Sequence, residues 1–226
     1  MAGIPVIIYG KSGAGKSRSL KNFASDEIYL INTIGKPLPF KGAFKYVTNG
    51  DDIQKMMLGL SKMTTKVAVI DDFGYVMTNM FMRGHGQGDQ FKLYNGIGDT
   101  VWNFLNYIQS PAVPDGSIVY LMLHEDVSED GTNKLRTIGK LLDQKVCIEG
   151  MVTIVLHAIV KGGRHVFLTN SDGNDIAKSP EGLFPDIEID NDLKAVDDAI
   201  RAYWELPPRT GNTNKAKKNA ENKEEK

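Results

Sequence analysis

The sequence predicts an α/β protein in which helices flank a mostly parallel β-sheet with a C-terminal antiparallel hairpin. Two observations predict this fold class. Short apolar runs typical of buried strands alternate with segments of helical periodicity between residues 4 and 123, which is the pattern of parallel strands joined by helices. Two later strand-like runs follow one another across Gly162 and Gly163, a spacing typical of an antiparallel hairpin.

The first predicted element is a short apolar strand, Pro5–Tyr9, that stops at a glycine. A helix over Ser17–Ala24 follows, and then strands over Ile28–Ile31 and Phe44–Val47, which are separated by a turn rich in glycine and proline. An aspartate cap and apolar residues at helical spacing predict a helix over Asp51–Met63.

The middle of the chain contains the clearest core strand, Val67–Ile70. Helical spacing predicts helices over Tyr75–Met82 and Leu93–Ile108, on either side of a glycine-rich stretch. Another all-apolar strand, Ile118–Leu123, is followed by a polar loop that we expect to run over residues 124–134.

The last third predicts the hairpin strands Met151–Val160 and Arg164–Thr169. Apolar residues that recur every three or four positions then predict a helix over Asp192–Trp204. We expect residues 1–206 to form a single domain and residues 207–226 to form a disordered, charged tail.

Length and composition support one domain and exclude some functions. The 226 residues (25.0 kDa) are 41% hydrophobic and 24% charged, which suits one sizeable core and is short for two. Residues 212–226 contain five lysines, three glutamates and no large apolar residue. They carry +2 of a net charge of −1, which leaves −3 on the rest. A surface that coats nucleic acid throughout is therefore excluded.

Nothing in the sequence predicts a membrane segment, a disulfide or a zinc site. The longest apolar run, Val152–Val160, is interrupted by Thr153 and His157 and is well short of the ~20 residues that cross a bilayer. Residues 1–9 are too short for a signal peptide, and Cys147 is the single cysteine. We expect a cytoplasmic protein.

The segment after the first strand has the pattern of a phosphate-binding loop. Its residues are Gly10, Lys11, Ser12, Gly13, Ala14, Gly15, Lys16 and Ser17. A strand before the loop and a helix after it would direct backbone N–H groups and a helix N-terminus at phosphate oxygens. Lys16 would then reach the β- and γ-phosphates of ATP, and the Ser17 hydroxyl would bind Mg²⁺. A glycine-rich turn that binds nothing is the alternative.

An acidic pair ends the core strand that begins at Val67. By register, Asp71 is expected to hold Mg²⁺ through a bound water. Asp72 is a candidate for polarising the water that attacks ATP, and the alternative is that it caps the helix predicted to start near Gly74.

The next core strand ends in His124 and Glu125. His124 would lie beside the γ-phosphate and could signal its presence to the following loop; the alternative is a surface histidine without that role. His85, His157 and His165 have no identifiable partner in the sequence, so we expect them to be structural.

The chain resembles phage-encoded RecA-like ATPases, a group of minimal recombinases and single-strand-annealing proteins often described as AAA-family ATP-binding proteins. The resemblance covers approximately residues 4–204 and rests on the phosphate loop and on Val67–Asp72, Ile118–His124, Gly139–Leu142, Asn174–Phe184 and Ile189–Leu193. It implies a RecA-like P-loop NTPase core, ATP and Mg²⁺ as cofactors, and assembly into a ring or filament. Single-stranded DNA and a single-strand-binding protein are the implied partners, in the cytoplasm of a bacterial host.

The resemblance also implies two loops that face DNA, at Arg83–Lys92 and at Glu125–Ile138. In the first, glycines allow close approach, and two cations and Phe91 offer charge and stacking. The second is acidic before Lys134 and Arg136. A mobile, solvated loop is the alternative for each.

Two further expectations concern hydrolysis. By resemblance, Lys178 would reach the γ-phosphate of a neighbouring subunit, with Arg164 as a substitute, although an ordinary exposed lysine is the alternative. Relatives usually carry a water-activating glutamate near the end of the second strand, where this chain has Asn32 and Thr33. Either Asp72 or Glu125 would take that task, or hydrolysis is slow and ATP acts as an assembly switch.

The sequence thus predicts an ATPase that acts on single-stranded DNA in phage recombination or replication. Its main alternative is a nucleotide-dependent assembly or regulatory protein that binds no DNA, which the near-neutral charge and the acidic second loop favour. A small-molecule kinase would need an arginine-rich lid, and the long loops contain few arginines.

Overall fold

A nine-stranded mixed sheet forms the centre of the computed structural model, which describes residues 2–209. The strands are β1 (Ile4–Gly10), β2 (Tyr29–Asn32), β3 (Tyr46–Asn49), β4 (Val67–Asp71), β5 (Ile118–Val127), β6 (Asn133–Leu135), β7 (Ile154–Lys161), β8 (Arg164–Leu168) and β9 (Glu188–Asp190). Their order is β3-β2-β4-β5-β1-β7-β8-β9, with β6 paired to β5. Strands β3 through β7 in this order run parallel, whereas the β7–β8, β8–β9 and β5–β6 pairs are antiparallel.

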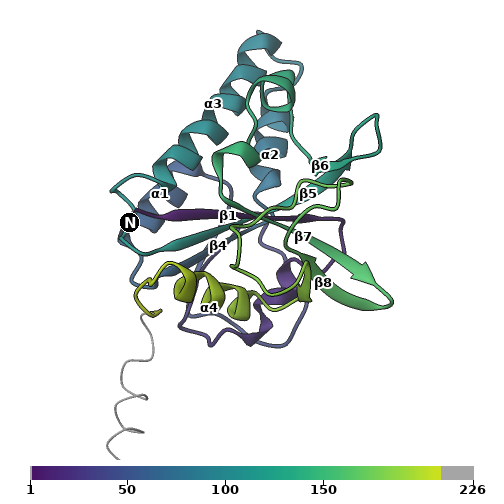
Figure 1. Ribbon diagram of the computed structural model, residues 1–226. Coiled ribbons are helices and arrows are strands. Elements are labelled where there is room, and N and C mark those ends of the chain that lie inside the picture. Colours follow the sequence, from purple (N-terminus) through teal and green to yellow (C-terminus); the bar gives the residue numbers. More distant parts are fainter. Residues whose placement is uncertain (1, 210–226) are drawn as a thin grey trace, which may run out of the picture.

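Helices cover both faces of the sheet (Figure 1). The four α-helices are α1 (Ile53–Lys62), α2 (Gly74–Gly84), α3 (Gln90–Ile108) and α4 (Leu193–Tyr203). Three short helices are the 3₁₀ segments η1 (Ser17–Asn22) and η3 (Glu149–Met151) and the π-helical η2 (Leu141–Lys145). Helices α1, α2 and α3 lie on one face, and α4 lies with η1 on the other. Among residues 2–209, no helix is both long and apolar enough to span a bilayer.

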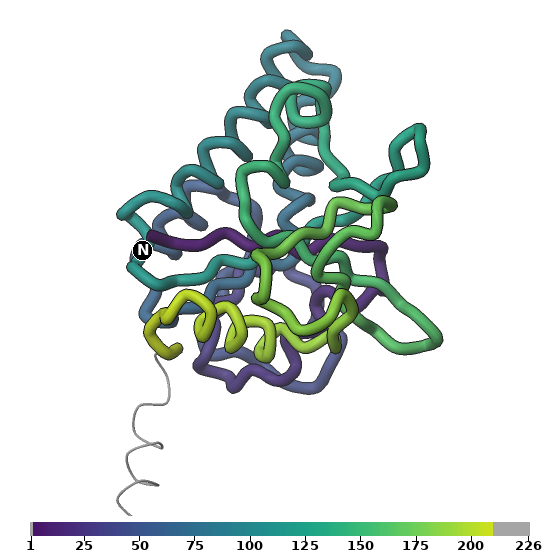
Figure 2. Tube along the Cα trace, viewed as in Figure 1, coloured from purple at the N-terminus to yellow at the C-terminus, as the bar shows by residue number. Residues whose placement is uncertain are grey.

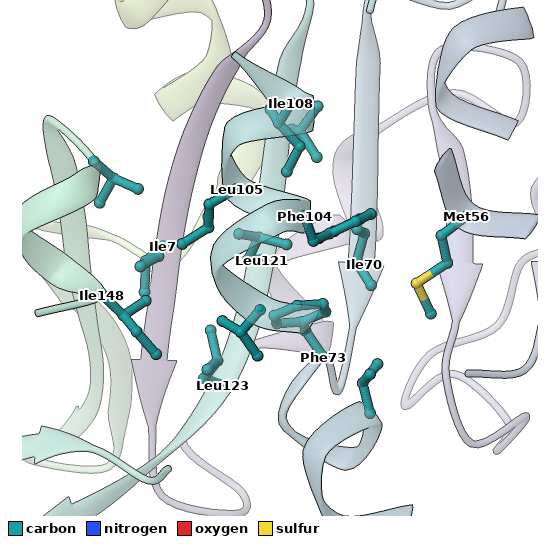
Figure 3. Close-up of a cluster of buried hydrophobic side chains, with 14 of the residues drawn as sticks. Ile7, Met56, Ile70, Phe73, Phe104, Leu105, Ile108, Leu121, Leu123 and Ile148 are labelled. Atoms are coloured by element: carbon teal, nitrogen blue, oxygen red, sulfur yellow. The ribbon is translucent and has the colours of Figure 1, made fainter. Parts of the chain in front are cut away.

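The core consists of two layers because successive strand residues point to opposite faces. In β1, Ile7 and Tyr9 join the cluster beneath α1–α3, and Val6 and Ile8 join the cluster beneath α4. Figure 3 shows the first cluster, where side chains from α3 meet those from β4 and β5. Burial on both faces explains why the central strands are near-continuous apolar runs.

A buried polar network fixes α4 against the sheet. The Tyr120 hydroxyl of β5 donates a 3.0 Å hydrogen bond to Asp197, and Arg201 Nε donates a 2.7 Å bond to the same carboxylate. Arg201 also donates to the carbonyls of Lys66 and Gly116, at 2.7 and 3.3 Å. Residues 207–209 continue along α4, and the rest of the predicted tail lies outside the described residues.

The predicted α/β class, its mostly parallel sheet and the C-terminal hairpin are confirmed. The helices predicted around residues 51–63, 75–82, 93–108 and 192–204 are present within a few residues of their expected ends. Strand β3 begins two residues later than predicted, and β6, β9, η2 and η3 were not predicted.

The prediction of a helix over Ser17–Ala24 is wrong in type and length. The segment forms only the six-residue 3₁₀ helix η1. The Ser19 hydroxyl donates to the Lys16 carbonyl, and Ala24 N donates to the Glu27 side chain, which turns the chain. Serine hydroxyls and acidic side chains compete in this way with the hydrogen bonds of an α-helix.

The polar loop predicted over residues 124–134 is shorter than expected and spans only residues 128–132. Strand β5 continues through His124 and Glu125 to Val127 and pairs with β6 in a hairpin. The apolar pattern stops at His124, but Glu125 is still buried, and the strand becomes exposed only at Asp126 and Val127. This extension places Glu125 on a strand, and its side chain is therefore fixed by sheet geometry.

Candidate functional site

The predicted phosphate loop follows β1 at the carboxyl-terminal edge of the parallel strands. A Cβ on Gly10 would lie 2.2 Å from the Ala158 carbonyl oxygen of β7, so only glycine fits there. Gly13 and Gly15 have φ angles of +82° and +103°, which side chains rarely adopt. The glycines therefore shape the loop. Because η1 is a six-residue 3₁₀ helix, the expected α-helix N-terminus does not contribute to the site.

Lys16 is buried and folded back over the loop. Its ammonium group donates hydrogen bonds to the carbonyls of Gly10 and Lys11, at 2.7 and 3.0 Å. Burial lowers the pKa of Lys16 to about 8, although the charges of Asp72 and Asp71 oppose that shift. A buried cation held only by carbonyl groups is well suited to bind an anion.

Ser17 connects the loop to the acidic end of β4. Its hydroxyl donates a 2.8 Å hydrogen bond to Asp71 Oδ1. Strand β4 is not the direct neighbour of β1, because β5 lies between them, yet the Ser17 and Asp71 side chains meet across it. Burial raises the pKa of Asp71, and the charge of Asp72 raises it further.

The residues at this point fit a magnesium ion. Ser17 and Asp71 supply hard oxygen ligands, which Mg²⁺ prefers when phosphates and waters complete its coordination. Among residues 2–209, no group of three or more His, Cys, Asp or Glu side chains could hold a metal.

Asp72 is buried and takes part in an ion-paired cluster. It has an unusual φ of +58°, and its carboxylate contacts the Lys36 ammonium and, at 3.5 Å, His124 Nε2. Burial alone would raise the pKa of Asp72, but hydrogen bonds from His124 and Lys36 outweigh burial and hold it below its usual value. The alternative that its side chain caps α2 is wrong, because α2 begins after Phe73 without a side-chain cap.

Lys36 was not predicted as a site residue. It belongs to the loop after β2, and Asn32 holds that loop through two hydrogen bonds, from Gly35 N at 3.0 Å and to the Lys36 carbonyl at 2.7 Å. Burial would lower the pKa of Lys36, but its contact with Asp72 raises it instead. The resemblance implies an acidic residue near the end of the second strand. In this chain the loop after that strand instead places a lysine beside Asp72.

His124 lies level with Gly10 in the pairing of β5 with β1. Its ring meets the Tyr75 ring edge-on, with 5.9 Å between the centroids. His124 is thus held between Asp72 and the first turn of α2, at the level where the phosphate loop begins. A sensing role stays a prediction.

Glu125 belongs to a different side-chain cluster from His124, the residue before it. Its Oε2 lies 2.9 Å from His157 Nε2, and the other ring nitrogen, Nδ1, lies 3.3 Å from Asp175 Oδ2. The His157 ring stacks on Tyr9 at 4.3 Å with an interplanar angle of 10°. Burial raises the pKa of the Tyr9 hydroxyl, which accepts a hydrogen bond from Ile176 N.

Residues of the loop and this cluster line one cavity. Lys11, Ser12, Gly13 and Ala14 lie on one side, and Glu125, Asn133, His157 and residues 158–160 line the rest of a cavity of about 420 Å³. Lys11 Nζ is 3.7 Å from Glu125 Oε1. The cavity therefore joins residues of the phosphate loop with one acid, Glu125, and the imidazole of His157.

His165, expected to be structural, packs against the back of the loop. Its Nδ1 lies 3.0 Å from the Ala14 carbonyl oxygen. A Cβ on Gly15 would lie 2.8 Å from the same nitrogen. Strand β8 thus supports the loop conformation.

Comparison with models of known protein families gives no match to this chain, and no curated protein matches it significantly.

Lys178 lies apart from the loop within the chain. Its backbone pairs with Val155 of β7 through two hydrogen bonds of 2.8 and 2.9 Å, and Val155 is aligned with Ile7, three residues before Gly10. That separation corresponds to about 10 Å along a strand. Arg164, the substitute, is 3.3 Å from the Glu188 carboxylate. Neither cation meets the loop of its own chain, and a role across subunits stays a prediction.

The two segments predicted to face DNA differ in structure. Residues 83–92 form the tip between α2 and α3, which rises away from the sheet (Figure 2). The second segment is the β5–β6 hairpin and the chain that follows it. Between α3 and residues 134–143 lies a groove of about 560 Å³ whose lining includes Phe91, Tyr94 and Lys140.

Three residues of the site, Lys36, His157 and Asp175, were missed by the sequence interpretation. His157 is the only polar residue in an apolar stretch of β7, and that position was the available signal. Lys36 lies in no recognisable motif. Asp175 lies in the Asn174–Phe184 segment that carries the resemblance, but the sequence does not show that it meets His157.

Proposed function

We propose that this chain is a Mg²⁺-dependent ATPase with a RecA-like P-loop core, and that it acts on single-stranded DNA in phage recombination or replication. The observation that carries the nucleotide part is the 2.8 Å hydrogen bond between Ser17 of the loop and Asp71 at the end of β4. This contact joins the two halves of a nucleotide and magnesium site that lie far apart in the sequence.

In this proposal the chain's own groups bind and orient the triphosphate. Lys16 would leave the Gly10 and Lys11 carbonyls for the phosphate oxygens, and loop N–H groups would bind the other oxygens. Magnesium, held by Ser17 and Asp71, would neutralise charge on the phosphates when bound.

Calorimetry with Mg-ATP, together with the melting temperature, tests the nucleotide part. We expect heat of binding and a rise in melting temperature, because a ligand that binds only the folded state stabilises it. Lys16→Ala should remove both effects, whereas the exposed Lys21→Ala serves as a matched control and should keep both. Absence of heat and of stabilisation in the wild-type chain would refute the proposal.

The groove beside α3 supports the DNA part. Phe91 is 74% exposed at its rim, which is unusual for a large apolar side chain without a partner, and Tyr94 and Lys140 lie in the same groove. Aromatic faces beside cations are the elements that bind unpaired bases and their phosphates.

Two ion pairs favour the alternative, a nucleotide-dependent assembly or regulatory protein without DNA. Arg83 is 2.8 Å from Asp51, and Lys134 is 2.6 Å from Asp143. Both cations are thus already partly neutralised by the chain itself.

A salt titration of single-stranded DNA binding, with and without Mg-ATP, separates the two proposals. DNA binding through phosphates should weaken steeply as salt rises. Phe91→Ala should weaken it roughly tenfold, on the scale of about 1–3 kcal/mol for one stacked base. The exposed Trp102→Ala on α3, outside the groove, is the control. If the chain binds Mg-ATP but does not bind single-stranded DNA even at low salt, the DNA part of the proposal is refuted and the assembly or regulatory protein is favoured.

A further inference from the structure

Three buried titratable side chains beside the phosphate loop have no role in nucleotide binding as described above. Glu125, His157 and Asp175 come from β5, from β7 and from the loop before residue 178, and their side chains are at most 6% exposed. The imidazole lies between the two carboxylates, 2.9 Å from Glu125 and 3.3 Å from Asp175.

The arrangement fixes the orientation of each member. The Tyr9 ring stacks against the face of the imidazole, and Asp175 Oδ1 accepts a 2.8 Å hydrogen bond from Ala177 N. The backbone therefore holds Asp175 in place. Asp175 and the Tyr9 ring in turn orient His157, and His157 orients Glu125. A chain of supports of this kind keeps a functional side chain in one position.

Glu125 keeps a second oxygen that points toward the phosphate loop. Oε1 is 3.7 Å from Lys11 Nζ, at the cavity that the loop residues also line. The charge of Glu125 also raises the pKa of Lys16, so its carboxylate acts on the ammonium expected at the phosphates.

Asp72, the other candidate base, is differently occupied. The Lys36 ammonium contacts one of its oxygens directly, and His124 lies 3.5 Å from the other. An acid that is stabilised as a carboxylate in this way is a weak proton acceptor. The lysine beside Glu125, Lys11, is 3.7 Å away and 76% exposed.

We propose that Glu125 is the general base of ATP hydrolysis and that His157 and Asp175 are positioning residues that hold its carboxylate toward the phosphate loop. This inference rests on the proposed function. A proton of the attacking water passes to Glu125, and the water oxygen bonds to the γ-phosphorus. The bond between that phosphorus and the oxygen of ADP breaks, so ADP, phosphate and one proton are the products.

Other titratable groups also face the cluster. Lys11 and Lys16 face Glu125 from the loop. Tyr9 of β1 is within electrostatic range of Glu125 and Asp175, and also of Glu149 of η3. His157 would donate to the Glu125 carboxylate, so its loss should leave that carboxylate less firmly oriented.

The first test separates turnover from binding. We expect Glu125→Gln to lower kcat about 100-fold or more, and His157→Gln and Asp175→Asn to lower it about tenfold. In all three the Kd for Mg-ATP, measured by calorimetry, should change less than about threefold. Asp72→Asn should lower kcat less than tenfold, and the exposed Asp99→Asn is a matched acid-to-amide control.

The second test uses the nucleotide-free protein and needs no activity. With only four histidines in the chain, the ring resonances of ¹⁵N-labelled histidine can be assigned by His157→Gln. Glu125→Gln and Asp175→Asn should shift the His157 ring resonances, and Asp72→Asn should shift those of His124 instead. A His157 signal that responds to Asp72→Asn and not to Glu125→Gln would overturn the cluster.

The proposed function and the inference fail in different ways. A wild-type chain that does not bind Mg-ATP refutes the function. The inference alone is refuted if the wild-type chain hydrolyses ATP and Glu125→Gln retains its turnover. It is also refuted if Asp72→Asn lowers kcat more than Glu125→Gln does.

Discussion

Two acid–histidine pairs lie at the phosphate-loop edge, and their surroundings differ. Asp72 meets His124 and an additional lysine, Lys36, whose side chain is 44% exposed. Glu125 meets His157, which is closed off by a second acid and by Tyr9. The first pair thus includes a lysine in contact with its acid, and the second includes an additional carboxylate.

The neighbouring side chains, rather than the residue type, therefore decide whether a buried carboxylate is free to accept a proton. His124 and Glu125 are consecutive, and successive strand side chains point to opposite sides, so adjacent residues join separate pairs. Lys36 and His124 stabilise the charged form of Asp72. The second cluster contains one imidazole between two carboxylates, and this ring fixes the position of Glu125.

The largest expected effect comes from removing the imidazole. His157→Leu leaves Glu125 and Asp175 buried without a donor between them, and we expect the free energy of unfolding to fall by about 3 kcal/mol at pH 7.5. Urea unfolding measures this loss. A loss below about 1 kcal/mol would show that the buried carboxylates do not depend on the imidazole, and would contradict the difference drawn between the two clusters.

A smaller effect concerns Lys16, on which both acids act. Its pKa of about 8 means that the ammonium loses its proton as pH rises from 7 to 9. We therefore expect affinity for Mg-ATP to fall about tenfold over that interval, with proton uptake on binding at pH 9. Calorimetry in two buffers of different ionisation enthalpy measures both.

The same titration can rank the two acids. The charge of Asp72 raises the pKa of Lys16 more than that of Glu125 does. Asp72→Asn should thus move the midpoint of the affinity loss to lower pH by more than Glu125→Gln does. The reverse order would contradict the placement of Asp72 as the closer countercharge.

We expect the smallest effect on the free energy of unfolding from removing Lys36, the partly exposed cation beside Asp72. The pKa of Asp72 is below its usual value, so its pairing stabilises the fold above the unfolded pKa of about 3.9, and this stability is lost as pH falls through the folded value. Because Lys36 is partly exposed, Lys36→Met should cost about 1 kcal/mol or less at pH 7. The difference from wild type should vanish once the pH falls below the folded-state pKa of Asp72. A difference that persists there would exclude the ion pair as its cause.

Much of the fold followed from local pattern. Apolar runs, helical spacing and the glycine pair at 162–163 were sufficient for the alternating elements and the hairpin. The pattern failed where a polar side chain bonded to nearby backbone, as at Ser19, and where a strand continued through buried polar residues, as at Glu125. Local hydrogen bonds and sheet pairing outweighed periodicity at these positions.

The sequence by itself determined the loop residues and Asp71, because a motif contiguous in the chain and an acid at a strand end reach one edge in any parallel sheet. Only the tertiary structure decided the partners of Asp72 and Glu125. His157 reaches Glu125 because β7 pairs with β1 with His157 opposite Tyr9, and Lys36 reaches Asp72 because Asn32 folds its loop back. Such contacts depend on strand order and loop path, which are properties of the folded chain as a whole.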